Sequence, residues 1–348
     1  MIFFVQDIVA QLKELEKQRA FDSLVILSDQ NTYPLLPGAF ETLETKHFHI
    51  IIPAGEQHKN LSTAQFIWEE MKKGGASRKS WMVNIGGGTL SDLGGFCAAT
   101  YMRGISTINI PTTLLSMVDA AVGGKNGINL GGIKNLVGTF HEPEQVWLHP
   151  EFLYTLPEEE LQNGWGEVIK HGIIAGGELW ELSRAVIPPI KETQIWSRLI
   201  LLNIELKKQI VQEDPRESGK RKILNLGHTV AHALESVFMS HGEYISHGHA
   251  VAIGMVIESI AGELASITPT ATAQAIIETV AKTFPLIPIA RNWEPAFFQA
   301  MTSDKKTVAG ELQFALPISI GQVIPDQVLS REHIIRAFEI YNKNAAKI

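Results

Sequence analysis

The sequence predicts an α/β N-terminal domain built on a parallel sheet, followed by an all-α C-terminal domain. In the first part of the chain, short β-rich runs alternate with helical ones, as in a parallel α/β layer. After residue 150 the apolar residues follow helical spacing instead. With 348 residues, of which 45% are hydrophobic and 19% charged, the chain has enough apolar material for two globular cores. We therefore expect domains at residues 1–150 and 151–348.

Four strands are expected in the N-terminal domain, because each run is β-rich and ends in glycine, proline or polar residues. They span residues 23–30, 47–55, 80–88 and 106–113. Residues 61–76 read as a helix closed by Gly74 and Gly75. The first residues lack the basic start of a signal peptide and soon become a charged amphipathic helix.

Five helices are expected in the C-terminal domain. They span residues 157–175, 197–214, 223–238, 249–267 and 271–284. The most apolar of them contains Glu258 and Glu263, so it reads as a buried helix rather than a membrane span. A boundary between two domains commonly forms a ligand cleft, and we expect the active site there.

The charge balance and the cysteine count exclude several classes of function. A formal net charge of -7 argues against nucleic-acid binding, but a local cationic pocket could still hold a small anion. The single cysteine, Cys97, excludes an intrachain disulfide and a zinc site built from cysteines. It fits a reducing compartment, and we expect a cytoplasmic protein.

A glycine-rich loop, "NIGGGTLSDLGGF", leaves a strand and enters a helix at residues 84–96. Glycines let the backbone approach a ligand, and free amides at a helix start attract phosphate. The loop is neither the dinucleotide fingerprint nor a Walker loop, and a tight turn without any ligand is the alternative. Asp92 would repel a pyrophosphate, so a ribose hydroxyl or an amide is its expected partner.

The segment "MVDAAVGGKNGINLGGIKNLVGTF", residues 117–140, combines glycines with Asp119, Lys125, Lys134 and Asn135. It has too many glycines for a core helix and too many apolar residues for a disordered linker. We expect the chain to wrap around an anionic ligand here. The alternative is a surface loop whose lysines are solvated.

Two histidines one helical turn apart, His228 and His232, share one face of an expected helix. A catalytic zinc needs about three protein ligands, and Glu167 is the candidate carboxylate. Spacing leaves two ligand sets open, which are Glu167 with both of these histidines, or Glu167 with His228 and a histidine of the loop "HGEYISHGHA". A third possibility is a buried ion pair of Glu167 with Lys170, without any metal.

Further positive charge surrounds the histidine segment. Lys207, Arg221 and Asn225 precede it closely, and Lys305 lies near the end of the chain. Each alone is typical of a solvated surface. Together they favour a site for a phosphorylated, carboxylated molecule, which arginine would grip in a fork and lysines as point charges.

These motifs together resemble the 3-dehydroquinate synthase family of the shikimate pathway, over nearly the whole chain. The resemblance depends on the order and spacing of "PAGEQHK", "GGGTLSDLGGF", "YMRG", "PTTLLSMVDAAVGGKNGIN", "KNLVGTF", "EFLYTLP", "GWGEVIKHG", "LNLGHTVAHALE", "HGHAVAIGM" and "DKK". It implies an NAD-binding N-terminal domain and a metal-binding C-terminal domain. The implied enzyme depends on NAD and one divalent metal, zinc or cobalt. It would convert 3-deoxy-D-arabino-heptulosonate 7-phosphate (DAHP) to 3-dehydroquinate and phosphate.

The resemblance also implies roles for individual residues. The implied metal ligands are Glu167, His228 and His247, and His232 would instead lie beside the substrate phosphate. The implied catalytic residues are Lys125, Lys170, Arg221, Asn225 and His232. Substrate contacts are implied for Asp119, Asn135, Lys207, Lys305 and Arg103. The implied NAD-binding residues are Asp29, Asn31, Glu56, Lys59, Gly87, Gly88, Thr89, Asp92, Thr112, Thr113, Lys125, Lys134, Phe152 and Thr155.

Arg103 would reach the phosphate site of a neighbouring subunit, which implies a homodimer. Three positions depart from the family's pattern: His249 replaces a Glu, Asn126 replaces a Thr, and Lys220 replaces an apolar residue. We assign the metal to His247 by position, with His249 as the rival.

Three other functions compete with this one. The first is a sister sugar-phosphate cyclase, of the 2-deoxy-scyllo-inosose or valiolone type. It would share the metal and NAD motifs, but Arg221, Asn225 and Lys305 match the dehydroquinate pattern. The others are a metal-dependent polyol dehydrogenase, which would form NADH, and a non-catalytic NAD-binding protein.

Overall fold

The computed structural model divides the chain into two compact units, Met1–Leu156 and Pro157–Ile348. The structure describes residues 1–18, 21–35, 38, 40–131, 133–303, 307–308 and 311–345. The division falls close to the boundary expected after residue 150. No helix in these ranges is long and apolar enough to span a membrane.

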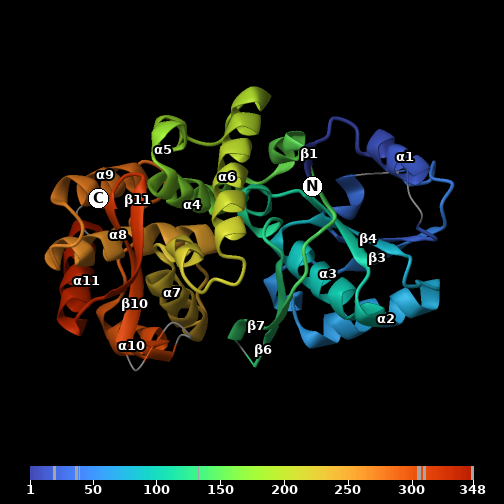
Figure 1. The fold of residues 1–348 in the computed structure, drawn as a ribbon. Coiled ribbons are helices and arrows are strands. Elements are labelled where there is room, and N and C mark those ends of the chain that lie inside the picture. The colour runs from blue at the N-terminus through green and yellow to red at the C-terminus, as the bar shows by residue number, and fades with distance from the viewer. Residues whose placement is uncertain are drawn as a thin grey trace. The chain divides into compact units, whose positions relative to one another are not determined.

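The first unit is built on a six-stranded sheet in the order β1-β8-β5-β4-β2-β3 (Figure 1). Every neighbouring pair of its strands is parallel, so the predicted parallel sheet is confirmed. Its strands are β1 (Ile2–Phe4), β2 (Leu24–Asp29), β3 (His47–Ile52), β4 (Trp81–Gly86), β5 (Ser106–Pro111) and β8 (Gln145–Leu148). All residues of β2 are buried, as expected of a parallel strand covered on both faces.

Three helices accompany this sheet: α1 (Ile8–Gln18), α2 (Leu61–Gly74) and α3 (Gly88–Thr100). Asn60 caps α2, since its side chain accepts a hydrogen bond from the amide of Thr63, and Gly75 ends it in the left-handed conformation. α3 packs against β4 and β5 through buried residues that include Leu93 and Phe96. The apolar face of α3 therefore fixes where its N-terminus meets the end of β4.

The lysine-rich segment folds as an antiparallel hairpin of β6 (Lys125–Leu130) and β7 (Ile133–Phe140). Gly127 and Gly138 oppose each other in this hairpin, and a Cβ on Gly127 would lie 2.9 Å from the carbonyl oxygen of Val137. The glycines thus let the two strands approach. The sequence predicts a wrapping loop here, so the two regular strands differ from that expectation.

The second unit is mainly helical, as predicted (Figure 1). Its helices are α4 (Glu158–Ala175), α5 (Gly177–Ala185), α6 (Thr193–Glu213), α7 (His228–Ser240), α8 (His247–Leu264), α9 (Thr270–Ala281), α10 (Glu294–Ser303) and α11 (Arg331–Ala345). It also contains an antiparallel sheet of β9 (Thr307–Val308), β10 (Glu311–Ser319) and β11 (Gln322–Val328), so an all-α domain is too narrow a description.

The helix expected at residues 223–238 begins later than predicted. Gly227 has a φ of 80°, in the left-handed region, so the regular helix α7 starts at His228. A Cβ on Gly227 would lie 2.8 Å from the carbonyl oxygen of Val251. This close approach to α8 explains why a glycine is needed where the chain turns into α7.

Candidate active site

A buried carboxylate and a buried ammonium lie on α4. Glu167 and Lys170 are 0% and 2% exposed, and they form an ion pair across three positions of the helix. Leaving either charge unpaired at this depth would cost several kcal/mol (on the order of 3–5), so each group lowers the cost of burying the other. The ion pair that the sequence suggested is present, whereas the alternative of a pair without any metal stays a prediction.

Two imidazoles converge on the same carboxylate. The Nε2 atoms of His228 and His247 lie 3.6 Å and 3.5 Å from Oε1 of Glu167. One ligand atom from each of these residues lies within 4.8 Å of the other two. Two imidazole nitrogens and one carboxylate oxygen are the donors of many catalytic zinc sites, so the donor set fits a divalent cation.

The other ring nitrogen of each imidazole faces an acceptor. Nδ1 of His228 lies 3.1 Å from the carbonyl oxygen of Leu226 and must donate to it, because a carbonyl only accepts. Nδ1 of His247 lies 3.4 Å from Oε1 of Glu235. Such partners fix the tautomer and leave Nε2 for a metal.

The pKa of His247 reflects these neighbours. Burial disfavours the charged imidazolium, but the carboxylates of Glu167 and Glu235 outweigh this effect and raise the pKa to about 9. A concentration of negative charge around His247 also favours a cation at this position.

The other two candidate histidines lie outside this group of three. The ring of His232 meets that of His228 edge-on, with 5.6 Å between centroids. Nε2 of His249 lies 2.8 Å from the carbonyl oxygen of Pro285, and its ring packs on Phe284. The structure thus gathers the ligand set implied by the resemblance, while metal binding by it stays a prediction.

α4 and α8 approach each other closely beside this site. A Cβ on Gly166 would collide with the carbonyl oxygen of Gly248, and a Cβ on Gly248 with that of Asn163. The side chain of Asn163 also accepts a hydrogen bond of 2.8 Å from the amide of Gly248. Glu167 and His247, each next to one of these glycines, are thereby brought together.

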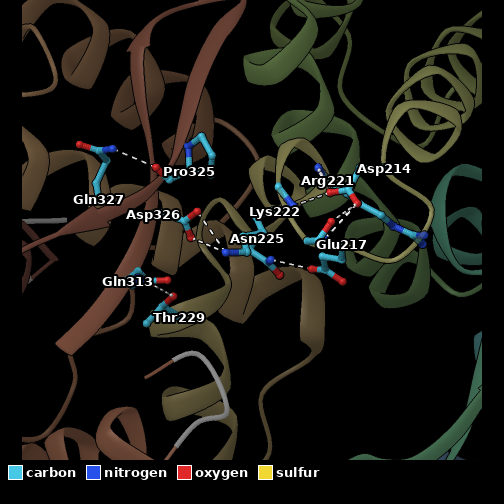
Figure 2. Close-up of polar contacts among 12 residues, drawn as sticks. Asp214, Glu217, Arg221, Lys222, Asn225, Thr229, Gln313, Pro325, Asp326 and Gln327 are labelled. Atoms are coloured by element: carbon cyan, nitrogen blue, oxygen red, sulfur yellow. Dashed lines mark hydrogen bonds and ion pairs between the residues drawn. The ribbon is translucent and has the colours of Figure 1, made fainter. Parts of the chain in front are cut away.

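Asp214 organises the segment that bears Arg221 (Figure 2). Its carboxylate accepts hydrogen bonds from the amides of Ser218 (2.9 Å), Gly219 (2.7 Å) and Arg221 (3.0 Å). Burial alone would raise the pKa of Asp214, but these amides outweigh it and lower the pKa to about 2. The guanidinium of Arg221 donates to the carbonyl oxygen of Pro215, 2.9 Å away.

Glu217 lies in the same segment and faces Asn225. It accepts a hydrogen bond of 2.8 Å from the Asn225 amide, as Figure 2 shows. Its φ of 58° is unusual for a residue with a side chain. Neither Asp214 nor Glu217 was singled out from the sequence, although an Asp before Pro215 is a recognisable turn signal.

We expect Asp214→Asn to raise the KM for the phosphorylated substrate that the resemblance implies by roughly 10- to 100-fold, while the affinity for NAD, the implied cofactor, is unchanged. The NH2 group replaces one carboxylate oxygen and cannot accept from the backbone amides that this oxygen faces, such as those of Gly219 and Arg221, so the segment that bears Arg221 would be held less firmly. Steady-state kinetics and NAD titration check this. Glu213→Gln is the matched control, because Glu213 is an exposed neighbour. An unchanged KM would contradict this role of Asp214.

The ionised Asp214 carboxylate also stabilises the fold. Because the pKa of Asp214 is depressed in the folded state, its contribution to the free energy of unfolding is complete above pH 3.8 and is lost as the pH falls toward 2.

In the first unit, several expected NAD-binding residues follow neighbouring parallel strands. Asp29 ends β2, Gly87 and Gly88 follow β4, and Thr112 follows β5. Ligands of open α/β sheets bind beyond these carboxyl ends. The carboxylate of Asp29 accepts hydrogen bonds from the amides of Asn31 (2.9 Å) and Thr32 (2.8 Å), which fixes the turn after β2.

A charged cluster lies at the start of α3. The ammonium of Lys59, 3% exposed, lies 2.5 Å from Oδ2 of Asp92 and 3.7 Å from Oε1 of Glu56. Burial lowers the pKa of Lys59, but these two carboxylates outweigh it, so the pKa is raised. Glu56 also accepts a hydrogen bond of 2.9 Å from Thr89. Asp92 thus has a lysine partner, in addition to the ribose hydroxyl or amide that the sequence predicts for it.

Asn129 links this cluster to the hairpin. Its side chain donates a hydrogen bond to Oε1 of Glu56 (3.0 Å) and accepts one from the backbone amide of Asn135 (2.9 Å). Asn135 itself has a φ of 51°. Nothing in the spacing pointed to Asn129.

The remaining expected residues are placed as follows. Lys125 begins β6, and Lys134 and Asn135 lie on β7. Asp119 lies in the helical turn at residues 116–120, Thr113 precedes it, and Arg103 is exposed with a φ of 73°. Phe152 and Thr155 lie in the turn at residues 150–155, and Lys207 is buried on α6. Lys305 lies outside the described residues.

Comparison with known proteins covers most of the chain. Residues 49–163 match the family described as 3-dehydroquinate synthase N-terminal, and residues 164–307 match 3-dehydroquinate synthase C-terminal. The 3-dehydroquinate synthase of Parabacteroides distasonis is 35% identical over 99% of this chain and 98% of its own length. That of Pyrococcus furiosus is 40% identical over 85% of each chain.

Solved structures share the fold. A 2-deoxy-scyllo-inosose synthase, crystallised with carbaglucose-6-phosphate, NAD+ and Co2+, superposes with a TM-score of 0.86, at 23% identity, over 98% of this chain and 96% of its own. A 2-epi-5-epi-valiolone synthase from Streptomyces hygroscopicus, with NAD+ and Zn2+ bound, has a TM-score of 0.86 at 22% identity, over 99% and 97%. The two family matches together span residues 49–307, and the Parabacteroides distasonis enzyme matches nearly the whole chain. The chain therefore belongs to the 3-dehydroquinate synthase family.

Proposed function

We propose that this chain converts DAHP to 3-dehydroquinate and phosphate. The reaction would proceed by oxidation of a ring hydroxyl, phosphate elimination, reduction, ring opening and intramolecular aldol closure. The observation that supports it most directly is the convergence of His228 and His247 on Glu167, next to the buried ammonium of Lys170. A cation site beside a fixed positive charge suits an anionic sugar substrate.

The proposed cofactors are NAD and one divalent cation, zinc or cobalt. Glu167, His228 and His247 would hold the cation, and the residues beyond β2, β4 and β5 would hold NAD. The cation would supply Lewis-acid chemistry at the reacting hydroxyl, and NAD would supply reversible hydride transfer. The net redox change is zero, so NAD acts as a catalyst.

Four residues of the second unit would bind the anionic groups of the substrate. Lys170 and Lys207 are both buried, and a charge interacts more strongly with an anion where solvent screens it less. Arg221 would grip a carboxylate or phosphate in a fork, and Asn225 would donate from its amide. Asp214 and Glu217 hold the latter pair before substrate arrives.

His232 is proposed to bind the substrate phosphate that leaves and to take part in the proton transfer that accompanies its elimination. A positioned acid–base group contributes about 100- to 10,000-fold to rate. Lys125, Asp119, Asn135 and Lys305 would contact the rest of the substrate. Arg103 would reach the phosphate site of the partner in a homodimer. The proposed location of the protein is the cytoplasm.

Incubation with DAHP, NAD and zinc tests this function. We expect phosphate and 3-dehydroquinate to appear in equal amounts, with no net NADH. Net formation of NADH would instead indicate a polyol dehydrogenase, and no turnover of DAHP would refute the proposal.

A sister sugar-phosphate cyclase is the second candidate, because two such enzymes share the fold at a TM-score of 0.86. Their identity to this chain is 22–23%, below the 35–40% of the 3-dehydroquinate synthases named above. A parallel incubation with glucose 6-phosphate tests for an activity of the 2-deoxy-scyllo-inosose type, whose solved relative was crystallised with carbaglucose-6-phosphate, and its release of phosphate would favour that alternative.

A further inference from the structure

A second buried carboxylate contacts the first turn of α7, which bears His228. Glu258 is 0% exposed and belongs to α8, the helix that begins with His247. Its two oxygens accept hydrogen bonds from the amides of Gly227 (2.7 Å) and Val230 (3.1 Å). Those amides flank His228 at the first turn of α7.

This contact satisfies backbone donors that a helix start leaves without partners inside the helix. No side chain of the residue before α7 can do so, because that residue is Gly227. The partial positive charge of the helix start also favours an anion there. Glu258 therefore supplies the cap of α7 from a neighbouring helix.

Close packing makes the position of the α7 start strict. A Cβ on Gly227 would lie 2.8 Å from both the Val251 carbonyl oxygen and Cγ of Met255, and a Cβ on Gly254 would collide with the Gly227 carbonyl. The start of α7 is thus seated directly on α8. Glu258 provides charged hydrogen bonds at this contact.

A reciprocal contact runs the other way. Glu235, on α7, lies 3.4 Å from Nδ1 of His247, on α8. Each of these helices therefore provides a carboxylate that supports the histidine of the other. Glu258 acts through the backbone beside His228, and Glu235 acts on the ring of His247.

We propose that Glu258 is a positioning residue for the metal site, which sets the place of His228 by holding the first turn of α7. This inference rests on the proposed function only in that a divalent cation binds Glu167, His228 and His247. Glu258 itself is not a ligand in this proposal.

The test compares Glu258→Gln with wild type by zinc titration against a chromophoric chelator and by the visible spectrum of the Co2+-loaded protein. We expect zinc affinity to fall by roughly 10- to 100-fold, the range for residues that orient metal ligands. The Co2+ absorption bands should shift, because the geometry around His228 relaxes. NAD affinity should stay within about twofold of wild type.

Glu263→Gln is the matched control, since Glu263 lies on the same helix but is partly exposed. Circular dichroism of the metal-free variants separates loss of fold from loss of positioning. If Glu258→Gln does not fold, Glu258→Asp keeps the charge with a shorter reach, and the same loss of zinc affinity is expected of it.

Wild-type zinc affinity and an unchanged Co2+ spectrum in a folded Glu258 variant would overturn the inference and leave the proposed function intact. Failure of the wild-type protein to bind zinc or cobalt would instead refute the metal site, and with it both proposals.

Discussion

The His247→Ala variant is expected to lose bound metal and turnover together. His247 supplies one of three donors, and Glu167 and His228 alone provide fewer ligands than a catalytic zinc needs. Loss of a residue that merely orients a ligand lowers metal affinity by about 10- to 100-fold. Loss of the ligand itself should therefore lower metal affinity by more than about 100-fold. Metal analysis of the purified variant and the coupled phosphate and 3-dehydroquinate assay provide the measurement.

The matched control for this variant is His249→Ala. His249 lies two positions further along α8, but its Nε2 faces the Pro285 carbonyl oxygen at 2.8 Å. The His249→Ala variant should keep its bound metal and show turnover within a few-fold of wild type. Retention of metal by the first variant and loss by the second would reverse the assignment.

Replacing either buried lysine by alanine, Lys170 or Lys207, is expected to abolish measurable turnover and spare NAD binding. Both ammonium groups are proposed to face the anionic substrate, and both belong to the second unit, whereas the residues expected to bind NAD lie in the first. We expect kcat/KM to fall by roughly 100- to 10,000-fold, as for loss of a positioned catalytic group. Calorimetric titration with NAD and steady-state kinetics check the two parts.

Two controls accompany these variants. Lys208→Ala removes an exposed lysine next to Lys207 and should behave as wild type. Lys170→Met keeps the length of the side chain without its charge, so it separates packing from electrostatics. A variant of either buried lysine that lost its affinity for NAD would contradict the assignment of these residues to the substrate.

The parallel sheet could be predicted because inner strands such as β2 and β4 are buried on both faces and read as continuous apolar runs. The strands of the second unit were missed for a physical reason. β10 and β11 contain Pro317 and Pro325, and proline weakens any strand prediction. The β6–β7 hairpin was missed because its glycines carry little β propensity.

The residue types of the site could be predicted, but their partners could not. Helical spacing places His228 and His232 on one face, yet it says nothing about the distance of either from Glu167 on another helix. His247, which does approach Glu167, lies in a loop-like sequence that gives no periodic signal. Glu235 and Glu258 were missed because their partners lie on another helix, beyond the reach of any local pattern.

The crossing of α4 and α8 at Gly166 and Gly248 has a consequence for how this site can change. The atoms that a methyl group would meet there belong to the main chain, so no rotation of a side chain could make room. The separation of the backbones that carry Glu167 and His247 is therefore set by the scaffold. Adaptation to a cation of another radius is therefore confined to the side chains themselves.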